Sequence, residues 1–221
     1  MKATINRFIA FEGIDGCGKT TQIGMLASLI RKHGIDVVET KEPMPNTEIE
    51  KRIRKELDEG IPDPFKFQML NVDARRIHVN EVIAPALGDG KYVITDRYMM
   101  STFAYGRAQG LDNGRLDALR KANEEFPKPM LTFLLDIDPL KSMRRTAERA
   151  MRLKIKQDNF ESKLGFVRRV RASYLIEAEH PYANGSVHVI DADKSVDDVH
   201  NSIADILSLG VGVSNAPGRN R

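Results

Sequence analysis

The sequence predicts an α/β protein of three layers, in which helices cover both faces of a mainly five-stranded parallel sheet. Strand-like and helix-like segments alternate along the 221 residues, an order that produces βαβ units. Short apolar runs such as 92–94 and 131–135 lack alternating polar residues, as strands buried on both faces do. A glycine-rich turn joins the first strand to the first helix. This length suits one domain, placed at 1–209.

The elements follow in a regular order. The apolar run 8–11 forms the first strand, and apolar residues between 23 and 30 give the next segment one helical face. Residues 210–221 have turn composition without periodicity, which predicts a disordered tail. Strands are expected near 7–12, 35–40, 91–96, 130–136 and 187–191, and helices near 18–33, 47–58, 65–87, 112–125, 139–150, 160–180 and 195–208.

Residues 13–20 read GIDGCGKT and match the phosphate-binding pattern G-x-x-x-x-G-K-[ST] between a strand and a helix. The glycines let backbone N–H groups face a phosphate, and the helix N-terminus attracts the anion. Lys19 is expected to reach the β- and γ-phosphates, and Thr20 to offer its hydroxyl to Mg²⁺. The fold is therefore of the P-loop NTPase type and binds a nucleoside triphosphate. The expected loop residues are Gly13, Ile14, Asp15, Gly16, Cys17, Gly18, Lys19, Thr20 and Thr21.

Composition narrows the class of protein. Charged residues make up 29 % and hydrophobic residues 41 %, as in soluble globular proteins. No apolar run approaches the roughly 18 residues of a membrane span, so no membrane partner is expected. Cys17 is the lone cysteine and cannot form an intramolecular disulfide. These features predict a cytoplasmic protein.

Positive charge is concentrated in residues 141–156, which hold seven Lys or Arg against one Glu. The net charge of +3 is too small to indicate nucleic acid by itself. The segment is interpreted as part of a small helical lid, about 143–160, that closes over a polyphosphate. A solvated helix face and a nucleic-acid-binding stripe are the alternatives.

Polar residues follow the expected strands, where parallel sheets bind ligands. Asp96 ends the third strand and is expected to help hold Mg²⁺, and Arg97 beside it to clamp an oxyanion. A structural ion pair between the two is the alternative. Asp15 would contact a substrate hydroxyl or a metal-bound water, or merely cap the loop. Residues 42–43 direct a carboxylate toward the cleft or form an ordinary turn.

The helix expected near 65–87 carries Phe67, Asn71, Arg75 and His78 on one face. An aromatic ring with an arginine on that face could stack on a base and hydrogen-bond to it. A half-exposed helix face is the more common situation, and the residues alone do not decide between the two.

With these residues in place, the chain resembles the thymidylate kinase (dTMP kinase) family to about residue 208. Residues 11–21 (FEGIDGCGKTT) resemble the family's F-E-G-x-[DE]-G-x-G-K-[ST]-T, and 41–43 (KEP) its R-E-P. Residues 96–105 (DRYMMSTFAY) resemble D-R-Y-x-x-S-x-x-A-Y, the most specific of the motifs. Residues 158–161 (DNFE) and 170–174 (VRASY) resemble D-[RN]-x-E and V-R-x-x-Y.

The resemblance implies transfer of a phosphate from ATP to dTMP, giving dTDP, with Mg²⁺ as cofactor. It implies that Arg97 holds the dTMP phosphate, that Tyr105 packs against the sugar and that Arg75 binds thymine. Because Gly16 stands where related loops have arginine, the lid would supply the catalytic arginines. The expected catalytic residues are Lys19, Arg97, Asp15, Arg145 and Arg149. ATP would also contact Arg145, Arg149, Arg152 and Ala192. The acceptor would contact Asp15, Glu42, Pro43, Arg54, Phe67, Asn71, Arg75, Arg97, Ser101 and Tyr105. The metal would contact Thr20, Asp96, Asp15 and Glu161.

Three positions depart from the family pattern. The phenylalanine that stacks on thymine is replaced by Asn71, with Phe67 one helical turn earlier. The residue after the A-Y pair is Gly106 instead of glutamine, and residues 44–46 have lost the two glycines that usually follow R-E-P. These changes concern the base pocket and leave the phosphate machinery complete.

Three other functions compete with this interpretation. The first is a kinase of another deoxynucleoside monophosphate, because the amide of Asn71 can pair with a base edge. The second is a non-catalytic nucleotide-binding switch, which would have no use for the lid and lacks the N-K-x-D motif of GTPases. The third is a nucleic-acid-binding protein, which would show strongly salt-dependent binding. The family resemblance also implies a homodimer.

Overall fold

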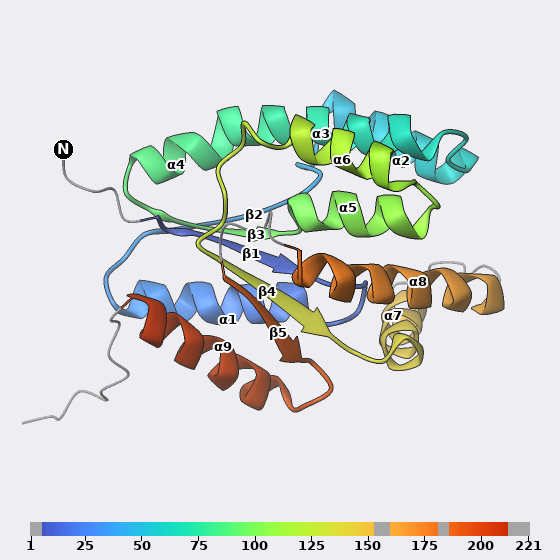
Figure 1. Ribbon diagram of the computed structural model, residues 1–221. Coiled ribbons are helices and arrows are strands. Elements are labelled where there is room, and N and C mark those ends of the chain that lie inside the picture. The colour runs from blue at the N-terminus through green and yellow to red at the C-terminus, as the bar shows by residue number, and fades with distance from the viewer. Residues whose placement is uncertain (1–5, 153–159, 181–185, 212–221) are drawn as a thin grey trace, which may run out of the picture.

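The chain forms one sheet of five parallel strands, seen in a computed structural model that describes residues 6–152, 160–180 and 186–211 (Figure 1). The strand order is β2–β3–β1–β4–β5, and all four pairings are parallel. The predicted sheet is confirmed, and each strand begins and ends within two residues of its expected bounds. The strands are β1 (Phe8–Glu12), β2 (Val37–Lys41), β3 (Tyr92–Asp96), β4 (Leu131–Asp136) and β5 (Ser186–Asp191).

Helices cover both faces of this sheet and confirm the three layers (Figure 1). One face carries α1 (Lys19–Lys32) and α9 (Val196–Val211). At the end to which the strand arrows point lie α7 (Pro139–Arg152) and α8 (Phe160–Ala178). The other face carries α2 (Glu48–Glu59), α3 (Pro64–His78), the π-helical turn η1 (Val79–Ile83), α4 (Ala84–Gly88), α5 (Met99–Ala108) and α6 (Asn113–Ala122).

The core lies on both sides of β1, whose five residues are all buried. Ile9 and Phe11 belong to the cluster that includes α1 and α9, whereas Phe8 and Ala10 belong to the cluster on the opposite face. Each large apolar side chain buried in this way stabilises the fold by about 1.5–3 kcal/mol. Two-sided burial also explains why the strand sequence shows no alternation of polar residues.

Helix α1 lacks the side-chain cap that three helices on the other face of the sheet have. Thr47, Asp63 and Asp112 cap α2, α3 and α6, and their side chains accept backbone N–H groups of the first turn. Helix α1 begins after Gly18, which has a φ of 104° and provides no side-chain cap. The first N–H groups of α1 therefore remain available to an anion.

The helix expected over 65–87 is divided into α3, η1 and α4. Pro85 lies in the first turn of α4 and has no N–H, so it cannot donate to the carbonyl of residue 81 as a continuous α-helix requires. The wider η1 turn absorbs this loss, since Ala84 N–H bonds instead to the carbonyl of Val79.

Helix α5 was not among the expected helices. Seven of its ten residues are buried, so its sequence has no apolar stripe with a polar opposite face. At the C-terminus, α9 continues to Val211, two residues into the expected tail, and residues 212–221 lie outside the description. None of the helices in the described part of the chain combines the length and the apolar character that a membrane span requires.

Candidate active site

The phosphate-binding loop leaves β1 at the carboxyl edge of the sheet and lines a cavity of about 600 Å³. Gly13, Gly16 and Gly18 have φ angles of 134°, 78° and 104°, a region that favours glycine. At Gly13 a Cβ atom would also lie 2.6 Å from the carbonyl oxygen of Leu135 on β4. The sequence pattern requires glycine at 13 and 18, and all three positions have backbone angles that glycine favours.

Lys19 and Thr20 begin α1 and face the end of β3. The ammonium of Lys19 donates to the carbonyl oxygens of Gly13 (3.2 Å) and Ile14 (3.3 Å) and lies 3.8 Å from Asp96 Oδ1. The hydroxyl of Thr20 donates to Asp96 Oδ2 over 3.2 Å. The structure thus brings together the three side chains that the sequence assigned to phosphate and metal.

The hydroxyl of Thr20 and the carboxylate of Asp96 suit Mg²⁺, which prefers oxygen ligands and retains several waters. The described residues contain no group of three or more His, Cys, Asp or Glu that could hold a metal by themselves. Such a pair fits an ion that arrives with a phosphate, because phosphate oxygens and water complete its coordination.

Arg97 follows β3 with a φ of 73°, an uncommon backbone conformation for a residue other than glycine. Its Nη1 donates to the Gly13 carbonyl oxygen (3.1 Å) and to the Tyr174 hydroxyl (2.8 Å), and its Nη2 donates to Asp15. The charge of Arg97 lowers the pKa of Asp15, and Lys19 acts in the same direction. Asp15 therefore stays an anion within the loop, and its carboxylate accepts a hydrogen bond from Nη2 of Arg97.

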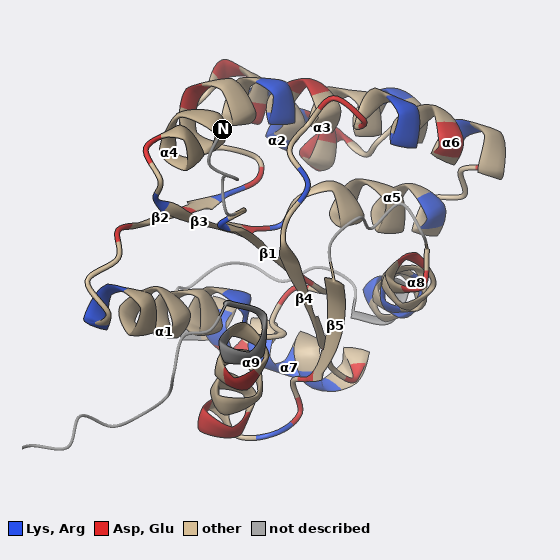
Figure 2. Ribbon diagram, turned by 60° about the vertical axis from the view of Figure 1, so that its left-hand side comes forward, with Lys and Arg blue, Asp and Glu red and all other residues tan. Residues whose placement is uncertain are grey.

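The lid helix α7 packs directly on the loop. The Ser142 hydroxyl donates to the carbonyl oxygen of Asp15, and Ser142 O and Thr146 Oγ1 would each lie 2.6 Å from a Cβ atom on Gly16. Two basic side chains of α7 reach the cavity: Arg149 lines it, and Arg145 donates to the Ala192 carbonyl oxygen over 3.4 Å. Figure 2 shows the Lys and Arg residues of α7 beside α1. The side chains of Arg152 and Glu161, and lid residues 153–159, lie outside the description.

Gly16→Ala is expected to lower kcat/KM at least about tenfold, because the methyl group collides with α7 and a φ of 78° strains alanine. Steady-state kinetics with ATP and a monophosphate would measure the loss. Gly24→Ala is the control, since a Cβ atom on Gly24 in α1 meets nothing within 4 Å. Equal activities for the two variants would contradict the docking of α7 on the loop.

A second cavity of about 260 Å³ adjoins the first. Asp15, Glu42 and Arg97 line both cavities, so the two meet at these three charged side chains. Helix α2 contributes apolar side chains to the wall of the second cavity, whereas α3 and α5 contribute mainly polar ones. The residues that line the second cavity alone are Pro43, Ile53, Leu57, Phe67, Gln68, Asn71, Arg75, Ser101, Thr102 and Tyr105.

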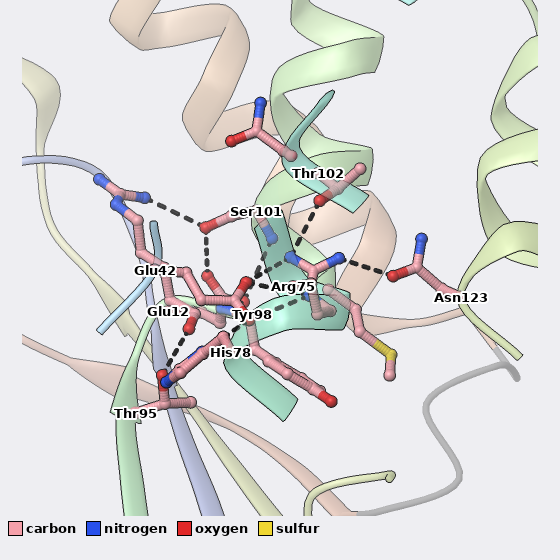
Figure 3. A network of polar contacts seen from close by, with 12 residues as sticks. Glu12, Glu42, Arg75, His78, Thr95, Tyr98, Ser101, Thr102 and Asn123 are labelled. Carbon is pink, nitrogen blue, oxygen red and sulfur yellow. Dashed lines mark hydrogen bonds and ion pairs between the residues drawn. The ribbon is translucent and has the colours of Figure 1, made fainter. Parts of the chain in front are cut away.

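Arg75 lines this cavity, is 2 % exposed and belongs to a network of polar contacts (Figure 3). Its Nε lies 2.9 Å from Glu42 Oε2, and its Nη2 donates to the same carboxylate. Nη1 donates to Asn123 Oδ1 over 2.6 Å, and Nη2 also donates to Thr102 Oγ1 over 3.1 Å. The Arg75 guanidinium thus binds Glu42, Asn123 and Thr102 and orients the Glu42 carboxylate.

Asn71 on α3 lies in the cavity wall. Its Nδ2 donates to the carbonyl oxygen of Phe67 over 2.9 Å, which directs the Oδ1 atom away from the helix backbone. Phe67 lines the same cavity but is 6 % exposed, because it packs with Ile53 and Leu70. The wall therefore combines an amide with the edge of an apolar cluster.

Two of the expected residues have other contacts. The side chain of Arg54 is 70 % exposed, pairs with Glu50 and lines neither cavity. The hydroxyl of Ser101 donates to buried Glu12 over 2.6 Å. Cys17 is 2 % exposed, and burial raises the pKa of its thiol, which agrees with a small residue that fills the loop.

Several lining residues were not expected. Thr146, Lys194 and Val196 line the first cavity, and Gln68 and Thr102 the second. Lys194 and Val196 follow β5, so the rule that ligands bind beyond strand ends would have found them. Thr146 and Gln68 carry no local signal, because their places depend on how the helices pack.

The chain matches the family model described as thymidylate kinase over residues 11–203. A probable thymidylate kinase of Pyrococcus horikoshii is 37 % identical over 206 residues, which cover 90 % of this chain and 95 % of that protein. A probable thymidylate kinase of Thermococcus kodakarensis is 38 % identical and covers 93 % of this chain and 98 % of its own length. A thymidylate kinase of Chromohalobacter salexigens is 37 % identical, with coverage of 91 % and 94 %.

Proposed function

Because the chain belongs to the thymidylate kinase family, we propose that it transfers the γ-phosphate of ATP to dTMP and releases dTDP and ADP. One observation carries the proposal: the phosphate-loop cavity and the smaller, partly apolar cavity meet at Arg97 and Asp15. A donor and an acceptor placed in these cavities bring their phosphates together at the junction. This arrangement favours transfer between two bound nucleotides over a switch that holds one.

The larger cavity is proposed to hold ATP. Its phosphates would lie against the loop N–H groups and Lys19, and its base near Ala192 and Val196. The smaller cavity is proposed to hold dTMP. Its base would lie beside Asn71 and Arg75, its sugar beside Tyr105, and its phosphate against Arg97.

The proposed reaction needs no protein nucleophile, because the dTMP phosphate is already anionic. One of its oxygens attacks the γ-phosphorus and forms a new P–O bond, while the bond to the β–γ bridging oxygen breaks and ADP leaves. Lys19, Arg97, Arg145 and Arg149 would neutralise the charge that builds up on the transferred group. Positioning and charge neutralisation together supply the catalysis.

Mg²⁺ would be held by Thr20 and Asp96 and would neutralise charge on the phosphates of ATP. The lid has a separate task. By closing over the cavity, α7 excludes water, so that the γ-phosphate passes to the acceptor and ATP is not hydrolysed.

ADP release from ATP and Mg²⁺, with dTMP, dUMP, dCMP, dGMP, dAMP and UMP offered singly, tests the function. The expected result is strong preference for dTMP. Activity mainly on another monophosphate would keep the mechanism and assign Asn71 to a different base. Lack of activity on all six would overturn the kinase proposal in favour of a binding protein.

Three further properties remain proposals. The family implies a homodimer, which sedimentation equilibrium would show as twice the mass of 24.8 kDa. A cytoplasmic location follows from composition alone, and fractionation of cells would test it. Binding to DNA is not expected, and its absence at low salt would dismiss a role of α7 in nucleic-acid binding.

A further inference from the structure

We propose that Tyr174 is a positioning residue for Arg97, and that buried Glu12 fixes Tyr174 in that role. This inference rests on the proposed phosphate transfer, because Arg97 stands at the junction of the donor and acceptor cavities. Neither Tyr174 nor Glu12 lines the donor cavity or the acceptor cavity. Both lie behind Arg97 and act through it.

Tyr174 makes the shortest of the three contacts to Nη1 of Arg97. The Nη1 atom lies 2.8 Å from the Tyr174 hydroxyl, 3.1 Å from the Gly13 carbonyl oxygen and 3.2 Å from Ser101 Oγ. The ring of Tyr174 belongs to α8, is 1 % exposed and meets the ring of Tyr105 edge to face. A buried ring on a packed helix thus holds the guanidinium through its hydroxyl.

Glu12 stands at the end of β1, fully buried, and accepts hydrogen bonds from four donors. The N–H groups of Tyr98 (2.9 Å) and Ser101 (3.2 Å) point to Oε1. The hydroxyls of Ser101 (2.6 Å) and Tyr174 (3.2 Å) lie at Oε2. Figure 3 shows Glu12 behind Ser101 and Tyr98. Burial raises the pKa of Glu12, whereas the Ser101 hydroxyl, the charge of Arg97 and the two N–H groups act in the opposite direction and favour the carboxylate.

The directions of the hydrogen bonds follow from the donors available. A carboxylate can only accept, so the Ser101 hydroxyl donates its proton to Glu12 over 2.6 Å, and the Tyr174 hydroxyl donates its proton either to Ser101 Oγ (2.6 Å) or to Glu12 (3.2 Å). The lone pairs of Ser101 and Tyr174 then face Arg97, which can only donate. The buried carboxylate therefore leaves lone pairs of both hydroxyls free to accept from the guanidinium.

The contacts to the Arg97 guanidinium hold the side chain of a residue that has unusual backbone geometry. Arg97 has a φ of 73°, so its own backbone does not favour the position that it occupies. Contacts from the phosphate loop, from α5 and from α8 fix its side chain before substrate arrives. A guanidinium fixed in advance loses less freedom when it binds phosphate and needs no reorganisation during transfer.

Tyr174→Phe is expected to lower kcat roughly tenfold, as loss of one hydrogen bond to a charged group does, with the KM for ATP within about twofold of wild type. Glu12→Gln, whose amide turns one hydroxyl around, is expected to cause a similar loss. Both changes disrupt the same positioning of Arg97. The kcat of the double variant should therefore be little lower than the kcat of either single variant. Tyr92→Phe is the control, a buried tyrosine at the opposite end of β3.

The guanidinium NMR signals of Arg97 provide a readout that does not depend on turnover. In ¹⁵N-labelled wild-type protein these signals should show slow rotation of the group, and in Tyr174→Phe faster rotation. Unchanged signals in Tyr174→Phe would overturn the positioning role. So would a double variant whose fold-loss of kcat equals the product of the two single losses. A wild-type protein without kinase activity but with a rigid Arg97 would overturn the proposed function alone.

Discussion

Arg97→Ala is expected to lower turnover with dTMP by about 100-fold or more, the effect of removing one charge-stabilising donor from a transfer site. The guanidinium lies where the two cavities meet, so its loss affects both phosphates at the moment of transfer. Asp15 also loses its ion-pair partner. Initial rates of ADP formation at saturating ATP and dTMP would measure the change.

Two matched variants sharpen this test. Arg97→Lys keeps the charge but loses the planar fork that holds two oxygens, so its rate should fall between those of alanine and wild type. Arg76→Ala removes a surface arginine of α3 that pairs with Glu125, and its rate should equal that of wild type. Near-normal turnover of Arg97→Ala would refute the role given to this residue.

Lys19→Ala is expected to reduce turnover by a similar factor, about 100-fold or more, because no other side chain of the loop carries positive charge. The ammonium of Lys19 is 7 % exposed and donates to the Gly13 and Ile14 carbonyl oxygens. A phosphate that enters the loop would take the place of these acceptors. The loss should therefore appear both in turnover and in the affinity for ATP.

Lys32→Ala is the control, because Lys32 lies exposed at the other end of α1. ATP affinity measured by calorimetry separates the two effects of Lys19. Unchanged ATP affinity together with unchanged turnover in Lys19→Ala would rule out the phosphate loop as the donor site. Thermal unfolding of each variant shows whether the fold survives.

The phosphate loop and the sheet could be predicted from the sequence because their signals are local. Residues 13–20 are contiguous, and each glycine requirement is set by the backbone angle at that position. Asp96 and Arg97 could be predicted as site residues because they lie at the end of a strand, and the carboxyl ends of parallel strands lie at one edge of the sheet. The lid side chains Arg145 and Arg149 were found through charge density, and the structure places both at the loop.

Packing hid other features from the sequence. Helix α5 is buried on most sides and lacks an amphipathic stripe, so no period revealed it. The helix over 65–87 looked continuous, although Pro85 divides it. Arg54 was expected at a phosphate but pairs with Glu50, one helical turn away. The side chain of Arg54 is exposed, and the sequence does not show which way an exposed arginine turns.

The sequence by itself determined the five strands, most of the helices, the phosphate loop and the family, since these depend on residues near one another in the chain or on ordered motifs. The tertiary structure alone decided which partners hold the site residues. Arg75 is bound to Glu42, 33 residues away, and Tyr174 meets Glu12 across 162 residues. Such contacts depend on how whole helices settle on the sheet, and no local pattern of polar and apolar residues carries that information.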